Sequence, residues 1–371
     1  MKIVFLSNYF NHHQKPLSDE LYTILGDGYN FIETTDMPKE RKALGYSDAD
    51  KPSYLKQYYT EGDTCQSLID FADFVIVGSA PYGLFESRLN NNKVVFRYSE
   101  RPLKSGFNLL KFLPRQFTWR KKFDMKKPQY LLCASAYAAH DYNIHGVFKK
   151  RALKWGYFTE LKEYSDIYSL INKKKENSLL WCGRFIDWKH PEKAIEIARR
   201  LNSDGIEFVL NFIGVGEMDT VLKEMVSKYD LSNVNFLGSM SPEKVREHME
   251  QSQIFLFTSD RNEGWGAVLN EAMNSACVVV ADRHIGSVPY LMKDEINGLV
   301  FNGKIDELYQ CVKRVLLNHE ERKQMSINAY NTIQQTWNAK VAAERLINVL
   351  KTYDGKKFDF NLYEQGPCSK A

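Results

Sequence analysis

The sequence predicts an α/β protein with two domains, each built on a mainly parallel sheet. Three observations lead to this prediction. The chain has 371 residues, which is enough for two domains of ordinary size. Short β-branched and aromatic runs alternate with helical patterns, as in βαβ units. Most of these runs are continuously apolar, which indicates strands covered on both faces, as in a parallel sheet.

The strand-like runs fall into two series. The first comprises residues 2–6, 30–34, 74–78, 94–98, 130–135 and 153–158. The second comprises residues 179–184, 208–214, 234–237, 254–258, 278–282 and 299–301. About a dozen strands are many for one open twisted sheet, so two sheets are favoured over one large sheet with a charged surface loop. The polar segment 160–177 separates the two series and is the expected hinge.

This division predicts an N-terminal domain of residues 1–165 and a C-terminal domain of residues 166–337. Among the helices, 191–201 has the clearest signals, with proline in the first turn and glycine beyond the end. Residues 337–353 again have a helical pattern. Residues 355–371 show no pattern and are expected to be loosely ordered.

The composition is that of a soluble globular protein, with 44% hydrophobic and 26% charged residues. No apolar run is long enough to span a bilayer. The N-terminal residues lack a basic and apolar leader, so no secretory signal is expected. The six cysteines contain no CxxC pair, and a reducing, cytoplasmic location is expected. Cys133, Cys182 and Cys277 lie in apolar runs and are expected to be small buried side chains.

Positive charge is concentrated between residues 104 and 127. This segment holds eight lysines and arginines and one acid, Asp124, although the net charge of the chain is only +4. Phenylalanine, leucine and tryptophan side chains are interleaved with the cations. Such a segment suits binding to a membrane surface, and packing of its aromatic side chains into the N-terminal core is an equal alternative. Nucleic acid is not expected as a partner, because no nucleic-acid-binding motif is present.

The most informative segment, residues 258–273, leaves a predicted strand and enters a helix through a glycine-rich turn. Such a turn directs backbone N–H groups and the positive end of the helix toward one point, which suits a phosphate. Ligands of open α/β sheets bind beyond the carboxyl ends of the strands, where this turn lies. Glu263 is in the turn, and Glu271 follows it at up to roughly 12 Å along a helix axis. One carboxylate can therefore reach a sugar ring while the other reaches a ribose.

The spacing Glu263-x7-Glu271, with Gly264-Trp265-Gly266 between the acids, closely resembles the signature of retaining GT-B glycosyltransferases of family 4. In the loop 286–291, Ser287 and Tyr290 replace a glycine and a glutamate of the family pattern. Further motifs of that family occur in the expected order: Gly183-Arg184 with Lys189, the turns 213–217 and 236–238, and the turn 297–299. The resemblance covers roughly residues 179–337.

The resemblance implies the GT-B fold: two facing Rossmann-like domains, with a C-terminal helix crossing back so that residues 338–371 join the N-terminal domain. It places the acceptor in the N-terminal domain and the nucleotide-sugar donor in the C-terminal domain. Arg184 and Lys189 would stabilise negative charge on the departing diphosphate, and Glu263 would hold hydroxyl groups of the donor sugar. The other donor-binding residues that it implies are Gly183, Gly264, Trp265, Gly266, Ala267 and, on the ribose, Glu271.

The implied reaction is transfer of a hexose from a UDP- or GDP-linked donor to a saccharide or lipid-linked saccharide, with retention of configuration. Neither a metal ion nor a cofactor is implied. The expected product is a surface polysaccharide, made in the cytoplasm or at the inner face of the cell membrane. Two alternatives stay open, namely a sugar-nucleotide epimerase on the same fold and a non-catalytic subunit that binds a nucleotide sugar.

The N-terminal domain is less informative. His12 and His13 follow the first strand and are candidate contacts to the diphosphate or the acceptor, with a solvated loop as an equal alternative. Glu100 follows the strand 94–98, where the family often has a histidine, and is a candidate contact to donor or acceptor. His140 and His145 are expected at the surface.

Two further motifs are interpreted without a catalytic role. Gly214-Val215-Gly216 is expected to be a turn at a strand end, because Asp219 stands where a dinucleotide-binding fingerprint needs glycine. Asp48-Ala49-Asp50 is a literal DxD, the metal-binding motif of a different glycosyltransferase fold. No apolar strand precedes it directly, so a chance occurrence is favoured.

Overall fold

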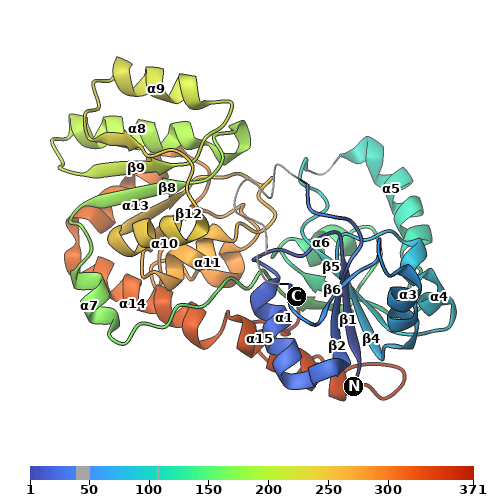
Figure 1. Cartoon of the computed structure of the whole chain (residues 1–371). Helices are drawn as coiled ribbons and strands as arrows, with labels where there is room; N and C mark the ends of the chain where they lie inside the picture. The colour runs from blue at the N-terminus through green and yellow to red at the C-terminus, as the bar shows by residue number, and fades with distance from the viewer. Residues whose placement is uncertain (39–50, 107) are drawn as a thin grey trace. The chain divides into compact units, whose positions relative to one another are not determined.

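The computed structural model describes residues 1–38, 51–106 and 108–371, which divide into two compact units (Figure 1). The N-terminal unit contains Met1–Glu160 and Asn338–Ala371, and the C-terminal unit contains Leu161–Trp337. The chain thus leaves the N-terminal unit at residue 160, whereas the sequence places the boundary at residue 165. The motif Asp48-Ala49-Asp50 lies outside the described residues.

The N-terminal unit is built on a parallel sheet with the strand order β3-β2-β1-β4-β5-β6-β7. The strands are β1 (Ile3–Ser7), β2 (Tyr29–Glu33), β3 (Leu55–Gln57), β4 (Phe74–Val77), β5 (Val95–Ser99), β6 (Gln129–Cys133) and β7 (Ala152–Lys154). β3 is missing from the sequence prediction because its residues are half-buried and do not form an apolar run. The order reverses between β1 and β4, and open α/β sheets bind ligands at the carboxyl ends of strands at such a point.

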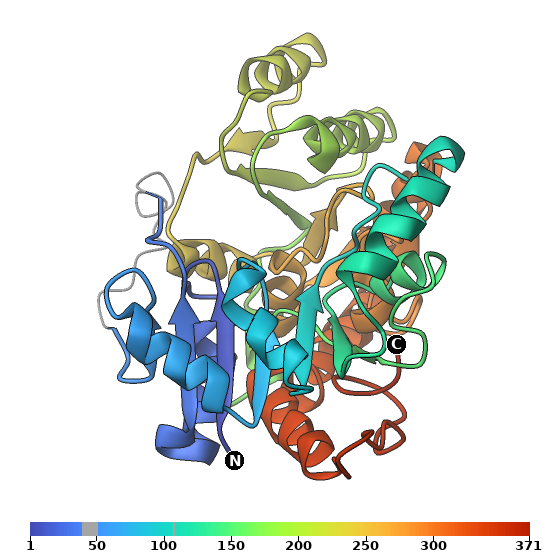
Figure 2. The ribbon, with the colours of Figure 1, turned by 90° about the vertical axis from the view of Figure 1, so that its right-hand side faces the viewer.

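Helices flank this sheet (Figure 2). They are α1 (Lys15–Leu25), α3 (Gly62–Phe71), α4 (Gly83–Asn90), α5 (Leu109–Lys122), α6 (Ala138–Asn143) and α15 (Ala339–Lys351). The last of them, α15, packs against α1, which comes from the opposite end of the sequence (Figure 1). The return of the final helix to the N-terminal unit is therefore confirmed.

The segment after α15 is packed, so the prediction that residues 355–371 are loosely ordered is wrong. Phe358 and Phe360 are buried, and their rings lie 4.8 and 5.7 Å from that of Tyr130. Side chains two residues apart in extended backbone point to the same side, which lets both rings reach the sheet. A segment without helical or strand periodicity gives no sequence signal for such a contact.

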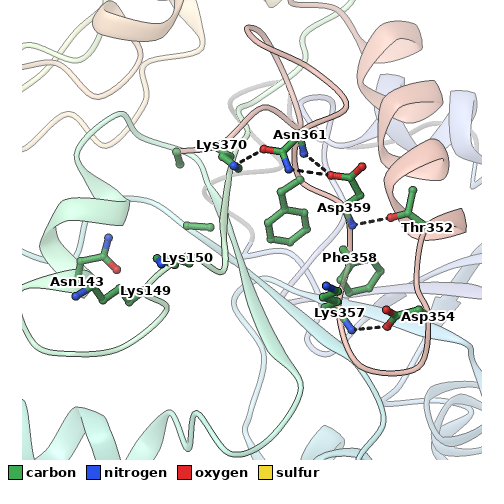
Figure 3. A pocket seen from close by; sticks show the side chains of 13 residues that line it. Asn143, Lys149, Lys150, Thr352, Asp354, Lys357, Phe358, Asp359, Asn361 and Lys370 are labelled. Atoms are coloured by element: carbon green, nitrogen blue, oxygen red, sulfur yellow. Dashed lines mark hydrogen bonds between the residues drawn. The ribbon is translucent and has the colours of Figure 1, made fainter.

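The end of this segment covers the outer edge of β7. The Cys368 N–H donates to the Lys154 carbonyl at 2.8 Å, and the Lys154 N–H donates to the Ser369 carbonyl at 2.7 Å. These bonds pair an edge strand that would otherwise expose its backbone groups. Beside them lies an open cavity of about 880 Å³, in which the Lys370 ammonium donates to the Asn361 side chain (Figure 3).

One face of α5 packs on the N-terminal unit. The rings of Phe112 and Trp119 lie 5.0 and 4.7 Å from that of His145. His145 is consequently only 1% exposed, so the prediction that it lies at the surface is wrong. His140 is exposed, as expected. The aromatic residues of the basic segment therefore do contribute to packing.

The opposite face of α5 is apolar and open to solvent. Leu109, Leu110, Leu113 and Phe117 are 79%, 89%, 70% and 76% exposed, and we call these four residues the α5 apolar face. At 100° per residue they fall on one side of the helix. The alternative of packing into the N-terminal core thus describes one side of α5, and binding to a membrane surface stays a prediction for the other. No helix in the described part of the chain has the length and apolar character needed to cross a membrane.

The C-terminal unit is built on a second parallel sheet, with the order β10-β9-β8-β11-β12-β13. The strands are β8 (Ser178–Cys182), β9 (Val209–Ile213), β10 (Val234–Phe236), β11 (Ile254–Phe257), β12 (Val278–Asp282) and β13 (Leu299–Phe301). Each overlaps its predicted run. The order reverses between β8 and β11, so the carboxyl ends of these two strands lie side by side.

The helices of this unit are α7 (Ile167–Asn172), α8 (Pro191–Ser203), α9 (Asp219–Lys228), α10 (Pro242–Gln251), α11 (Val268–Asn274), α12 (Val288–Leu291), α13 (Ile305–Leu317) and α14 (His319–Gln335). A short 3₁₀ turn, η3 (Asp187–Lys189), precedes α8. The predicted helix 191–201 is confirmed as α8, whose apolar stripe is buried in the core of the unit.

The cysteines form no disulfide within the described residues, and most of them are buried in the packing of the two units. Cys133 and Cys277 are buried, as predicted, whereas Cys182 is half-buried. The Cys277 thiol donates to the carbonyls of Met249 and Ser252 at 3.1 and 3.3 Å. Burial raises the pKa of this thiol, which keeps it protonated. All six cysteines are free thiols.

The packing of the tail predicts a stability effect. Phe358→Ala is expected to lower the free energy of unfolding by about 3 kcal/mol, because a buried aromatic side chain is removed. Urea denaturation followed by circular dichroism measures the change. Leu362→Ala is the control, since Leu362 is 41% exposed and its loss is expected to cost less than about 0.5 kcal/mol. Equal, small effects in both variants would contradict a packed tail.

Candidate functional site

The carboxyl ends of β8 and β11 carry a buried ion pair. The Lys189 ammonium lies 2.6 Å from the Glu263 carboxylate, and the two side chains are only 14% and 11% exposed. The Ser259 hydroxyl donates to the same carboxylate oxygen at 3.1 Å. The structure thus brings together two residues predicted from sequence, Lys189 and Glu263, and adds Ser259. Fixed charges at a strand end with little water around them act strongly on a nearby ligand.

Hydrogen bonds hold Lys189 in place from the neighbouring strand. The Thr258 hydroxyl, at the end of β11, is 2.8 Å from the Lys189 carbonyl and 2.9 Å from the His190 carbonyl. The Asp260 N–H donates to the Trp188 carbonyl at 2.9 Å. These contacts join the loop after β8 to the loop after β11. They explain why two side chains that are far apart in the sequence can form one ion pair.

The glycine-rich turn owes its shape to close packing. Gly266 has φ +84°, and a Cβ atom there would lie 2.3 Å from the Phe257 ring, so no other residue fits without a shift. The Trp265 side chain is fully buried, and its indole N–H donates to Asn270 at 2.9 Å. Trp265 therefore anchors the turn through its side chain, and only its backbone is available to a ligand. Gly264 is also buried, whereas Gly266 and Ala267 are half-buried.

The residues that depart from the family pattern support this turn. The Ser287 hydroxyl donates to the Trp265 carbonyl at 2.6 Å, and the Gly286 N–H donates to the Glu263 carbonyl at 3.2 Å. Tyr290 stacks on Trp337, with the ring centroids 5.6 Å apart. The loop 286–291 thus stabilises the turn that contains Glu263 through hydrogen bonds to its backbone carbonyls. Sequence spacing located this loop but could not indicate these contacts.

Glu271 lies in the first turn of α11, and its negative charge acts on the Cys182 thiol at the end of β8. The pKa of the Cys182 thiol is raised to about 12, first by burial and then by the negative charge of Glu271. The positive charge of Lys189 acts on the same thiol in the opposite direction. Glu271 and Lys189 therefore both lie within electrostatic reach of Cys182, directly before Gly183.

Arg184 occupies a different position from Lys189. It follows β8 directly and is exposed. Within the described residues its guanidinium forms no ion pair, in contrast to the buried pair of Lys189. Gly183 is fixed beneath it, since its N–H donates to the Ile213 carbonyl at 3.0 Å. An exposed guanidinium at a strand end is suited to binding a phosphate group from solution.

The segment Gly214-Val215-Gly216 is the turn that the sequence predicts at the end of β9. Gly214 has φ +138°, and a Cβ atom there would lie 1.9 Å from the Gly183 carbonyl oxygen. The Val215 carbonyl accepts from the Phe185 N–H at 3.0 Å. The turn therefore packs directly under the loop that carries Arg184, and it supports that loop.

In the N-terminal unit, the three predicted acceptor-side residues gather around Tyr157. The His12 and His13 rings lie 3.9 Å apart, and His13 lies 6.3 Å from the Tyr157 ring. The Tyr157 hydroxyl donates to Glu100 at 3.1 Å, and Lys104 pairs with the other carboxylate oxygen at 2.8 Å. Sequence reasoning missed Tyr157 because no motif surrounds it. The acceptor role of this group stays a prediction.

The described residues 1–38, 51–106 and 108–371 contain no group of three or more histidine, cysteine, aspartate or glutamate side chains placed to hold a metal ion.

The sequence of the C-terminal unit matches a family model described as "Glycosyl transferases group 1", over residues 166–332. Residues 166–332 are thus similar to this family, and we call this stretch the group 1 domain. The matched region of this group 1 domain contains Arg184, Lys189, Glu263 and Glu271, and therefore the whole candidate site of the C-terminal unit.

Two sequence relatives match less than half of their own length. An uncharacterized glycosyltransferase of Methanocaldococcus jannaschii is 29% identical over 160 residues, which are 43% of this chain and 44% of the relative. The amylovoran biosynthesis glycosyltransferase AmsK of Erwinia amylovora is 26% identical over 180 residues, 47% of this chain and 44% of the relative. The sequence similarity to these two relatives therefore covers less than half of either chain.

The structural similarity extends over both units. The crystal structure of Anabaena HepE in complex with UDP matches with a TM-score of 0.70 at 14% identity, covering 95% of this chain and 100% of that chain. The lipopolysaccharide biosynthesis glycosyltransferase WaaG matches with a TM-score of 0.63 at 15% identity, covering 95% and 100%. At such identities the likeness concerns the fold alone. The predicted GT-B fold is confirmed.

The geometry of the group 1 domain predicts different effects for its two cations. Lys189→Ala is expected to lower the free energy of unfolding by about 3 kcal/mol, because the Glu263 carboxylate stays buried without its counter-ion. Arg184→Ala, at an exposed position, is expected to change it by less than about 0.5 kcal/mol. Chemical denaturation of the ligand-free variants measures both.

The double variant Lys189→Ala with Glu263→Ala provides the control for this comparison. It is expected to lose less stability than the sum of the two single variants, because the second substitution removes the uncompensated charge. Additive losses would contradict a coupled ion pair.

Proposed function

We propose that this chain is a retaining, metal-independent hexosyltransferase that uses a nucleotide-sugar donor. The observation that carries the proposal is the Lys189–Glu263 ion pair at the switch point of the group 1 domain, with Arg184 exposed on the adjacent loop. The family of residues 166–332 and the fold of the whole chain support it.

Each residue has a role that suits its surroundings. Negative charge grows on the diphosphate as the bond to the sugar breaks, and the Arg184 guanidinium and the Lys189 ammonium stabilise it. Glu263 binds hydroxyl groups of the donor sugar while it holds Lys189 in place. Glu271 accepts hydrogen bonds from the ribose. The reaction needs no metal in this scheme, because two fixed cations supply the positive charge.

The donor is proposed to be UDP-linked, with a GDP-linked sugar as the second choice. Anabaena HepE, which shares the fold, was crystallised with UDP and with UDP-glucose. The acceptor is proposed to be a saccharide or lipid-linked saccharide of a surface polysaccharide. Relatives named for amylovoran and colanic acid biosynthesis support this direction. The reaction is proposed to take place in the cytoplasm.

The α5 apolar face is proposed to bind the inner surface of the cell membrane. Its four large apolar residues are exposed. The last turn of the same helix carries the exposed cations Arg120, Lys121 and Lys122. Apolar side chains that enter the interface and cations that meet anionic head groups together give stable binding. A lipid-linked acceptor would then be presented close to the N-terminal unit.

The donor site is tested by thermal stabilisation with UDP, GDP, UDP-sugars and GDP-sugars in the presence of EDTA. A ligand at about 100 times its dissociation constant adds roughly 2.7 kcal/mol to stability. Wild type and the control Glu224→Ala, an exposed position on α9, are expected to respond equally. Glu271→Ala is expected to lose the response, because the ribose contact is gone.

The outcomes separate the alternatives. No response of the wild type to any nucleotide would overturn the donor site. Binding without transfer to any acceptor would favour the non-catalytic subunit, and interconversion of nucleotide sugars without an acceptor would favour the epimerase.

The membrane contact is tested by sedimentation with vesicles of phosphatidylcholine and phosphatidylglycerol. The double variant Leu113→Ser with Phe117→Ser is expected to bind at least tenfold more weakly than the wild type, because each side chain contributes roughly 1.5–3 kcal/mol when buried. Val221→Ser is the control, since Val221 is exposed on α9. Equal binding of all three proteins would contradict this use of α5.

A further inference from the structure

A second cavity lies at the switch point of the N-terminal unit. It has a volume of about 520 Å³ and lies at the carboxyl ends of β1, β4 and β5. Its polar lining residues include Asn8, Thr34, Thr35, Ser79 and Ser99. Two cations, Arg97 and Lys122, also line it, and the described lining residues include no carboxylate. The cavity is therefore positively charged and rich in hydroxyl groups.

Arg97 lies in the middle of β5 and has no anionic partner among the described residues. Its Nε and Nη2 atoms are buried and form no hydrogen bond within the described residues. The guanidinium is held by aromatic rings instead, with its central carbon 4.4 Å from the Phe85 centroid, 5.5 Å from that of Phe123 and 5.8 Å from that of Tyr82. Such rings fix the position of the cation without neutralising its charge.

The charge of Arg97 persists at neutral pH. Burial lowers the pKa of Arg97 to about 10, and the neighbouring groups that oppose this shift are the phenols of Tyr142 and Tyr82. A group with that pKa is protonated at pH 7. The cavity thus contains a permanent, partly desolvated cation that its surroundings do not compensate.

Arg88 and Arg101, which are buried in the described part of this unit, have polar partners. Arg88 donates to the carbonyls of Ile69 and Ala72 at 2.6 and 2.9 Å, although its Nε atom forms no hydrogen bond. Arg101 pairs with the buried Asp141 at 3.4 Å. Buried cations in native proteins normally have such partners, because an unpaired one is costly. Arg97 differs from both, and an anionic ligand would supply the partner that it lacks.

Lys122 supplies a second positive charge at the cavity. It comes from the last turn of α5, and its ammonium lies 5.4 Å from the Phe123 ring, which also contacts Arg97. At the wall of the cavity the Ser99 hydroxyl donates to the Glu100 carbonyl at 2.8 Å and accepts from the Tyr142 hydroxyl at 2.9 Å. A guanidinium and an ammonium that line one space are what a carboxylate or a phosphate requires.

We propose that the Arg97 cavity binds an acidic group of the acceptor, so that this protein glycosylates an anionic saccharide. The proposal rests on the proposed function, because only a transferase needs an acceptor. The acidic group is either the carboxylate of a uronic acid or a phosphate ester, because both are anions that attract a guanidinium and an ammonium. The cavity therefore selects the acceptor by its charge.

The experiment compares binding of D-glucuronate, glucose 1-phosphate and neutral glucose to the full chain by titration calorimetry. The proteins are the wild type, Arg97→Met, Arg97→Lys and Lys122→Gln, with Lys126→Gln as the control at an exposed position outside the cavity. The wild type and the control are expected to bind at least one of the two anions and not glucose. The anion that binds more tightly identifies the carboxylate or the phosphate as the natural group.

Arg97→Met is expected to weaken anion binding at least tenfold, and Lys122→Gln about threefold. Arg97→Lys keeps the charge but loses the planar fork, so an intermediate loss is expected. Arg97→Met is also expected to melt no lower than the wild type, since it removes an unpaired buried cation. A purely structural arginine would instead lower the melting temperature without changing anion binding.

Three outcomes would overturn the proposal: no anion binding by the wild type, unchanged binding by Arg97→Met, or equal binding of glucose. UDP binding, measured on the same proteins, keeps this result separate from the proposed function. If all variants bind UDP like the wild type and anion binding is absent, only the anionic acceptor is wrong. If anions bind and no nucleotide does, the donor site is wrong and the Arg97 cavity stands.

Discussion

The candidate donor site depends on one buried ion pair, Lys189–Glu263, which joins the loop after β8 to the loop after β11. Removing two charges from water is costly, and such a pair persists only when other groups fix its geometry. Here the Thr258 hydroxyl holds the backbone of the lysine, and the Ser259 hydroxyl holds the carboxylate. Ser287 secures the adjoining turn from a third loop. Hydrogen bonds from the loops after β11 and β12 thus support the ion pair and its turn.

The sequence predicted what is encoded locally. Continuous apolar runs identified the strands of the described residues except the half-buried β3, and the spacing of Glu263 and Glu271 directed attention to the loop after β11. It could not predict contacts between distant segments. The packing of Phe358 on the sheet and the burial of His145 under α5 produce no periodic pattern of apolar residues in the sequence. The roles of Ser287, Tyr157 and Arg97 likewise depend on partners that are remote in the sequence. A single residue forms no sequence pattern, so these roles could not be predicted.

The buried cations of this chain differ in how they are compensated. The Lys174 ammonium donates to the carbonyls of Met249, Ser252 and Ser275 at 2.8–2.9 Å, so its charge is absorbed by backbone dipoles. Lys189 is neutralised by a carboxylate, whereas the Arg97 guanidinium lies against the faces of aromatic rings, which do not neutralise it. Lys174 therefore has a structural role. Lys189 is paired with its counter-ion in the candidate site, and the positive charge of Arg97 is the least compensated of the three. The extent to which a buried charge is compensated is thus consistent with the role proposed for each residue.

The return of α15 to the N-terminal unit has a consequence for the order of folding. The C-terminal unit is one continuous stretch, whereas the N-terminal unit needs residues 338–371, which the ribosome makes after the whole C-terminal unit. Until then α1 lacks its partner helix, and the edge of β7 is uncovered. Domains generally fold in the order of their synthesis. Here the C-terminal unit has all its residues before the N-terminal unit does, so the N-terminal unit is the last to be completed.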